Sequence, residues 1–160
     1  MATVIETRTV TVNAAFLQEI KEVNQDLWRL LGDVRRMCHN PTGIHTSPRR
    51  FLGLAEQLRD HLAMHFALEE AYGYFDDPVS VAPRLCEQAE RLRAEHATLY
   101  NMVVRVGESA EDLVSAVRRD DAVRGVVRNF HDFDAAFKRH EVQENELILQ
   151  EYHDDIGVGD

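Results

Sequence analysis

Apolar residues recur at alternating steps of three and four along four long stretches of the chain. This spacing places them on one face of an α-helix. Loop signals such as His39-Asn40-Pro41-Thr42-Gly43 and Asp76-Asp77-Pro78 separate the stretches. The stretches cover about residues 13–38, 47–75, 83–107 and 121–153. Between the last two, Ser109-Ala110-Glu111-Asp112 is typical of a helix N-cap and predicts a short extra helix that ends near residue 120.

Short connections between amphipathic helices favour antiparallel neighbours. The pattern therefore predicts an all-α fold, an up-down four-helix bundle with the short extra helix before the last long one. We expect one domain over residues 13–153, an N-terminal arm over residues 1–12 and an acidic, extended C-terminal tail over residues 154–160.

Six polar residues interrupt or flank the apolar faces. They are His61, His65 and Glu69 in the second stretch, His96 in the third, and His140 and Glu144 in the fourth. His65 lies 13 residues before Pro78 and His96 lies 13 residues after Pro83, so both are expected about 20 Å from the same turn. A buried carboxylate needs a partner, and a metal cation accepts carboxylate and imidazole donors together. A single inward histidine is usually a hydrogen-bonded core residue, but this group favours a metal site.

The composition limits the kinds of partner and the class of protein that we expect. The chain carries 18 Lys and Arg against 28 Asp and Glu, a formal charge of −10, which disfavours a nucleic-acid partner. We find no secretion signal and no apolar run long enough to span a membrane, so we expect a cytoplasmic protein. Two cysteines, Cys38 and Cys86, are too few for a disulfide framework or a Cys-rich zinc module.

The motifs HLAMHFALEE (residues 61–70), Glu95-His96 and HEVQENE (residues 140–146) resemble those of hemerythrin-like proteins, the HHE cation-binding domain family. The resemblance covers roughly residues 13–155. It implies a four-helix bundle that holds two non-haem irons joined by an oxo or hydroxo bridge, with zinc or manganese as other metals that suit such donors. It also implies that His65, His96 and His140 are terminal ligands, and that Glu69 and Glu144 bridge the metals.

Two positions depart from the family pattern. Asn24 stands where the family usually has a histidine on the first helix, and Tyr100 stands where oxygen-carrying members have a second histidine on the third. We expect His61 to replace the first missing ligand, or to hold a carboxylate in place. Tyr100 either packs, ligates as a phenolate or donates a hydrogen bond to a bridging oxygen. Glu70, Glu141 and Glu146 are interpreted as surface charges.

The resemblance implies a protein that binds or senses oxygen, nitric oxide, peroxide or iron. Two alternatives stay open at this point. The first is an oxidoreductase that acts on peroxide or nitric oxide at the same centre. The second is a structural bundle with a degenerate, zinc or mononuclear site. The sequence leaves the oligomeric state and the physiological ligand undetermined.

Overall fold

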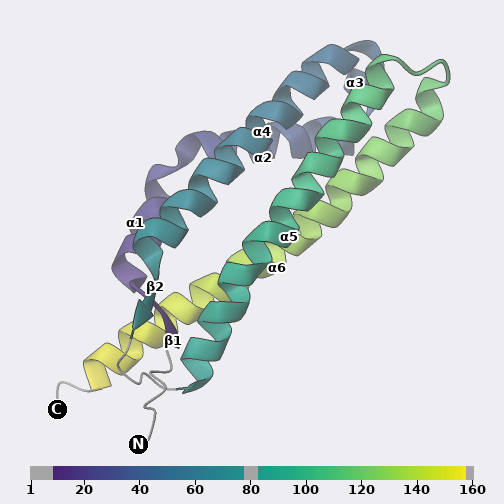
Figure 1. Ribbon diagram of the computed structural model, residues 1–160. Coiled ribbons are helices and arrows are strands. Elements are labelled where there is room, and N and C mark those ends of the chain that lie inside the picture. Colours follow the sequence, from purple (N-terminus) through teal and green to yellow (C-terminus); the bar gives the residue numbers. More distant parts are fainter. Residues whose placement is uncertain (1–8, 78–82, 158–160) are drawn as a thin grey trace, which may run out of the picture.

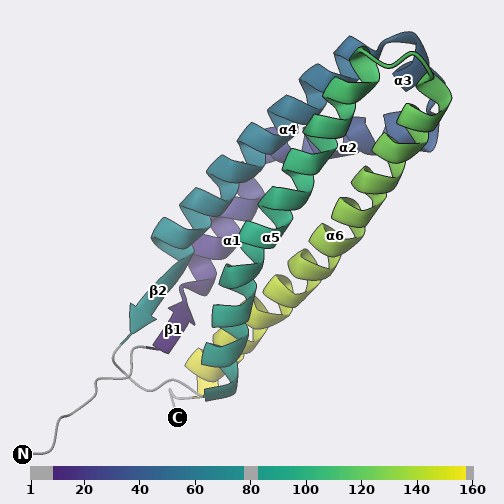
Figure 2. The same cartoon turned by 45° about the vertical axis from the view of Figure 1, so that its right-hand side comes forward.

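The computed structural model describes residues 9–77 and 83–157, which form an elongated antiparallel helical bundle (Figure 1). Its long helices run side by side, and the small α3 lies at the end where α5 turns into α6 (Figure 2). This arrangement confirms the predicted all-α bundle. The helices are α1 (Ala14–Val23), α2 (Gln25–His39), α3 (Thr42–Thr46), α4 (Pro48–Leu68), the π-helix η1 (Glu69–Gly73), α5 (Pro83–Val114) and α6 (Arg119–Gly157).

The first predicted helix is divided at Asn24. The Asn24 side chain caps α2, because its Oδ1 accepts from the backbone N–H of Leu27 (3.4 Å). The carbonyl of Lys21, near the end of α1, accepts instead from the indole N–H of Trp28 (2.8 Å). Phe16, which the periodicity placed inward, is 49% exposed. These two hydrogen bonds hold the backbone at Lys21 and Asn24 in place.

The second predicted helix ends earlier than residue 75. After Leu68 the chain forms η1, and then the strand β2 (Tyr74–Asp77) pairs antiparallel with β1 (Thr9–Val12). The sequence analysis predicted neither strand. Thr9–Val12 does alternate polar and apolar β-branched residues, at the shortest length at which alternation indicates a strand. Residues 9–12 of the predicted arm are thus part of the fold. The backbone of η1 at Gly73 passes close to Leu17 of α1. A Cβ added to Gly73 would lie 2.3 Å from Cδ2 of Leu17, so glycine fits this position.

The predicted short helix is not a separate element, because α5 continues through Gly107 to Val114. Glycine lowers helix stability by about 1 kcal/mol relative to alanine but does not end a helix by itself. At the other end, α6 continues to Gly157, so residues 154–157 of the predicted tail are helical, while residues 158–160 lie outside the described residues. His96 lies 18 residues before Val114 and His140 lies 21 residues after Arg119, so the two histidines are nearly level.

Two apolar clusters fill the bundle, with a layer of polar side chains between them. Along α5 the smaller cluster ends at Leu92 and the larger begins at Leu99, with His96 between. Along α6 the larger cluster ends at Phe137 and the smaller resumes at Leu147. The positions that recur at helical spacing in the third and fourth stretches are all buried: Leu85, Ala89, Leu92, His96, Leu99, Val103 and Val106, and Val123, Val126, Phe130, Phe133, Phe137, His140, Glu144 and Leu147. No helix in the described part of the chain is long and apolar enough to cross a membrane.

Candidate metal centre

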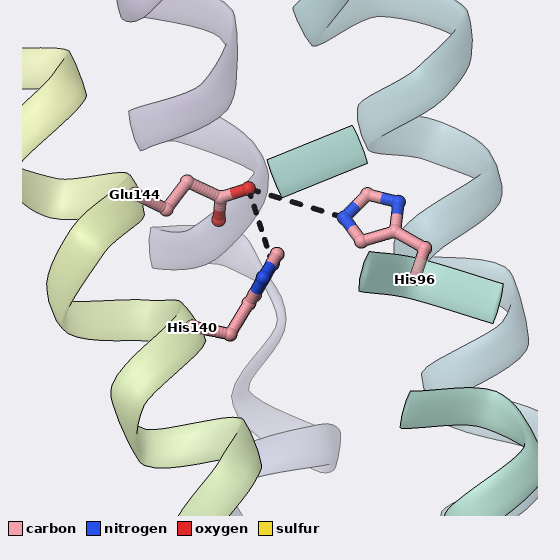
Figure 3. A group of neighbouring side chains, drawn as sticks. All are labelled: His96, His140 and Glu144. Atoms are coloured by element: carbon pink, nitrogen blue, oxygen red, sulfur yellow. Dashed lines mark ion pairs between the residues drawn. The ribbon is translucent and has the colours of Figure 1, made fainter. Parts of the chain in front are cut away.

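Five of the six predicted residues meet in the polar layer. His65 comes from α4, Glu69 from η1, His96 from α5, and His140 and Glu144 from α6. All are buried, with at most 3% of any of them exposed. Figure 3 shows one Glu144 oxygen facing the rings of both His96 and His140. Three separate parts of the bundle therefore deliver donors to one point.

The inward-facing atoms have the separations of ligands around a cation. Glu69 Oε1 lies 3.1 Å from His65 Nε2 and 3.8 Å from His96 Nε2. Glu144 Oε2 lies 3.5 Å from His140 Nε2 and 4.0 Å from His96 Nε2. Donors bound at about 2.1 Å to one metal are roughly 3.0–3.4 Å apart. Within the described residues, His96, His140 and Glu144 each offer one donor atom, and these atoms lie within 4.8 Å of one another.

The same atoms lack hydrogen-bond partners. Nε2 of His65, His96 and His140 and both carboxylate oxygens of Glu69 are buried without one. Buried polar atoms are normally satisfied, so a concentration of unsatisfied donors and acceptors at one point needs a common explanation. Imidazole nitrogen with carboxylate oxygen suits a transition-metal cation. The residues present therefore fit a metal ion at this position.

The outward-facing Nδ1 atoms are held by neighbours that set the ring orientation. His140 Nδ1 donates to Glu95 Oε2 (3.0 Å) and His96 Nδ1 to Glu70 Oε1 (3.4 Å). This arrangement leaves Nε2 free for a metal, as in carboxylate–histidine–metal triads. Glu70, predicted as a surface charge, is about half exposed but contacts the site.

His65 is oriented by an amide instead of a carboxylate. Asn24 Nδ2 lies 2.9 Å from His65 Nδ1, so the amide donates and the ring proton belongs on Nε2. The same amide caps α2 through its Oδ1, which accepts from the Leu27 N–H, so its orientation is fixed from both sides. Asn24 therefore acts on the outer side of His65 and is not directed at the centre.

Lys21 enters the site from α1, and the sequence analysis missed it. Its ammonium Nζ lies 2.5 Å from Glu144 Oε1 and 2.6 Å from Glu141 Oε2, and its side chain is 10% exposed. Glu141, predicted as a surface charge, is only 16% exposed and belongs to this pair. The available signal was the spacing: Lys21 lies one turn before Asn24 and one turn after the buried Leu17.

Tyr74 is the second residue that was missed. Its hydroxyl donates to Glu144 Oε2 (2.5 Å), and its side chain is buried. The helical periodicity selected Tyr72 instead, which is 60% exposed. The π-helix changes the register of the chain after Leu68, and no pattern in the sequence predicts such a turn.

In the metal-free site, the two carboxylates have pKa values shifted in opposite directions. Burial, followed by the neighbouring Glu144, raises the pKa of Glu69 well above its usual range. Burial also raises the pKa of Glu144, but the neighbouring His140 and the charge of Lys21 outweigh it and hold that pKa well below its usual range. Glu69 is therefore the protonated carboxyl and Glu144 the ionised one.

The pKa values of the basic groups are also shifted in opposite directions. Burial and the charge of Lys21 lower the pKa of His65 to about 4, and burial and His140 lower the pKa of His96 to about 3. Burial opposes the charge on Lys21, but Glu144 and Glu141 keep its pKa above the ordinary value. Two imidazoles are thus neutral at pH 7, while the ammonium stays charged.

The comparison with known families agrees with this geometry. The family model of the hemerythrin HHE cation-binding domain matches residues 15–152. The chain belongs to the HHE cation-binding domain family. The resemblance predicted from its motifs is thereby confirmed. No curated protein and no solved structure matches the chain.

His61 does not join the centre of this HHE domain. It is half-buried, and no contact in the described part of the chain joins it to the cluster, whereas the adjacent Leu62 is fully buried. The cause is geometric: residues 61 and 69 are eight apart, so their directions differ by about 80° around the helix axis. The expected replacement by His61 is therefore absent from the geometry.

Two surface clefts flank the centre of the HHE domain. One, of about 310 Å³, includes His96, Glu70 and Tyr100 in its lining, so Tyr100 lies on the outer side of His96, 38% exposed. The other, of about 450 Å³, lies among α1, α2 and α6 and includes Lys21 and Glu141. It is lined by Gln18, Lys21, Glu22, Trp28, Glu141, Asn145, Ile148 and Leu149.

Proposed function

We propose that this HHE domain binds a redox-active transition-metal cation, with iron as the expected metal, and uses it to bind or sense a small ligand such as dioxygen, nitric oxide or peroxide. The observation that supports this most directly is the set of unpartnered Nε2 atoms of His65, His96 and His140 beside the unpartnered carboxylate of Glu69. A family that binds cations supplies the second, independent support.

A purely structural role explains the site less well. Lys21 and Tyr74 compensate Glu144, but they leave the three ring nitrogens and both Glu69 oxygens without partners. Such atoms cost about 1–3 kcal/mol each when buried unsatisfied. A stable bundle needs none of them at these positions, since apolar residues pack equally well there. The donors are better explained by a cation that they hold.

The surroundings suit a small, weakly polar ligand. Phe66 stacks on His96 with ring centroids 4.0 Å apart, and Trp28 meets His65 edge-on at 5.7 Å, so apolar walls surround the donors. One cleft reaches His96 from the surface, and the other reaches Lys21 and Glu141. Iron, when bound, supplies an open coordination position and a change of redox state. The Lys21 ammonium and the Tyr74 hydroxyl supply hydrogen-bond donors inside the site.

Metal analysis tests this proposal. Protein purified from iron-supplemented cells is analysed for Fe, Zn and Mn, and the anaerobic ferrous protein is then titrated with nitric oxide and followed by electron paramagnetic resonance. We expect iron to be retained and a ferrous–nitrosyl signal to appear. His140→Ala should lose both, while His61→Ala, one turn before His65 on the same helix, should keep both. Protein without metal in iron-supplemented cells would count against the proposal.

Turnover of peroxide or nitric oxide is the alternative activity at the same centre. The specific observation in its favour is that two proton-bearing groups, Lys21 Nζ and Tyr74 Oη, contact Glu144 directly. Multiple turnover by the iron-loaded protein, lost in His140→Ala and kept in His61→Ala, would favour the enzyme. Stoichiometric binding without consumption would favour a sensor or carrier.

The family resemblance leads us to expect a pair of irons. In this chain the residues around the position of the second metal support a different occupant.

A further inference from the structure

The two oxygens of Glu144 serve different partners. Oε2 faces His140 (3.5 Å) and His96 (4.0 Å) and accepts from Tyr74. Oε1 faces the Lys21 ammonium at 2.5 Å. A carboxylate that bridges two cations needs one oxygen for each. On Glu144 the second of these places already holds a positive charge.

The possible ligand atoms are divided unequally between the two sides of the site. His96, His140 and Glu144 offer three ligand atoms within 4.8 Å of one another on one side. On the other side, His65 is the one histidine that the described residues bring near, and Asn24 is occupied with the outer nitrogen of that ring. Glu141 is paired with Lys21. A second cation would therefore lose its ligands to the ammonium or have to displace it.

Charge balance favours the same arrangement. Glu69, Glu141 and Glu144, the three carboxylates around the site, carry a formal charge of −3 once a bound cation has displaced the proton of Glu69. The Lys21 ammonium together with one divalent cation balances this charge. Glu70 and Glu95 lie on the outer side of the rings, where their side chains are 48% and 34% exposed and water screens them.

Lys21 is held in this position by its own backbone. Its carbonyl accepts from Trp28 Nε1, and the cap at Asn24 fixes the chain directly after it. It is also an uncommon residue in this chain, whose basic residues are arginines except at Lys21 and Lys138. A compact ammonium fits between two carboxylates as a small metal ion does, whereas a planar guanidinium needs more room.

We propose that this centre binds a single cation at His96, His140 and the adjoining carboxylates, and that the Lys21 ammonium takes the place of the second metal. The inference rests on the proposed function, because it presupposes that the site binds a cation. In this arrangement, one lysine on α1 sets the number of metals that the site binds.

The experiment counts metals. The full-length chain is freed of metal with a chelator, loaded anaerobically with excess Fe²⁺ or Mn²⁺, desalted, and analysed for metal per chain by mass spectrometry. We expect one ion per chain, and for Mn²⁺ the six-line paramagnetic resonance spectrum of an isolated ion. Two ions per chain with a spin-coupled spectrum would overturn the inference and leave the proposed function intact. No bound metal would overturn the proposed function, and the inference with it.

Substitution of the lysine tests its role directly. Lys21→Ala removes the charge and opens its space, and we expect the count to rise from one towards two ions per chain. Lys21→Gln, which keeps a hydrogen-bond donor, serves where the alanine variant does not fold, and the same rise is expected. Lys138→Ala changes the other lysine, which pairs with Asp134 and is 60% exposed, and should leave the count at one. A count of one in a folded Lys21 variant would overturn the role given to the lysine.

Discussion

At the scale of single residues, Glu144 concentrates the chemistry of the site. It contacts His96 and His140, accepts from Tyr74 and pairs with Lys21. The sequence predicted the two histidines, because their helical spacing places them on one buried face. It could not predict Lys21 or Tyr74, because a lysine near a helix end and a tyrosine after a π-helix give the same local pattern as exposed residues.

Cation binding should strengthen as pH rises. The pKa of Glu69 is raised by burial, and the pKa of His140 is raised because its contacts with Glu144 outweigh burial, so both keep their protons to higher pH than usual in the metal-free site. A cation binds their deprotonated forms and must displace these protons, which costs more as pH falls. We expect affinity to drop up to about tenfold per pH unit for each proton released.

Calorimetric titration of the metal-free protein, in two buffers of different ionisation enthalpy, measures this proton release. Glu69→Gln removes one titrating group and should reduce the number of protons released. Equal affinity at pH 6 and pH 8 would contradict the assignment of protons to Glu69 and His140.

The Tyr74 hydroxyl should stabilise the metal-free protein. It donates to an ionised, buried carboxylate, and hydrogen bonds to charged groups contribute about 1.5–3 kcal/mol. We expect Tyr74→Phe to lower the free energy of unfolding in urea by about that amount. Tyr72→Phe, at a position 60% exposed, should change it by less than about 0.5 kcal/mol. Equal effects of the two variants would remove this role from Tyr74.

At the scale of elements, regular helices were predictable and their interruptions were not. The inward faces of α5 and α6 follow from periodicity over many turns, and each predicted position is buried. The break at Asn24 and the π-helix at Glu69–Gly73 depend on hydrogen bonds that only the folded chain makes. Both interruptions lie beside the site, where π-helices are frequently found.

The crossing of η1 and α1 should tolerate only glycine at residue 73. An added Cβ would lie 2.3 Å from Cδ2 and 2.7 Å from Cγ of the fully buried Leu17, so the side chain or the backbone must move. Overpacking of this kind costs about 1–3 kcal/mol. We expect Gly73→Ala to lower the free energy of unfolding by that amount, measured by urea denaturation.

Gly53 in α4 provides the matched control. A Cβ there meets nothing within 4 Å, so Gly53→Ala should be neutral or stabilise the protein by up to about 1 kcal/mol through helix propensity. Stabilisation by Gly73→Ala of the same size would show that Leu17 and η1 are not closely packed.

At the scale of the whole molecule, the site divides the interior into two apolar clusters. α5 and α6 each change from apolar to polar and back at one level of the bundle, and α4 ends at the same level, shortly after His65. The sequence predicted this level for α4 and α5 by counting residues from their shared turn. The same count does not extend to α6 from the sequence alone, because α5 was expected to end at Gly107 and ends at Val114.

Because the donors come from three different parts of the bundle, metal binding should stabilise the whole fold. A ligand that binds only the folded state adds about 2.7 kcal/mol at a hundredfold excess over its dissociation constant. For a chain of this length that corresponds to roughly 5–10 °C in melting temperature. We expect Fe²⁺ or Mn²⁺ to raise the melting temperature by this amount under anaerobic conditions, and EDTA to reverse it. His96→Ala should abolish the rise, since it removes the donor from α5, whereas His61→Ala should keep it. An equal rise in the His96 variant would mean that the metal stabilises the protein from another place.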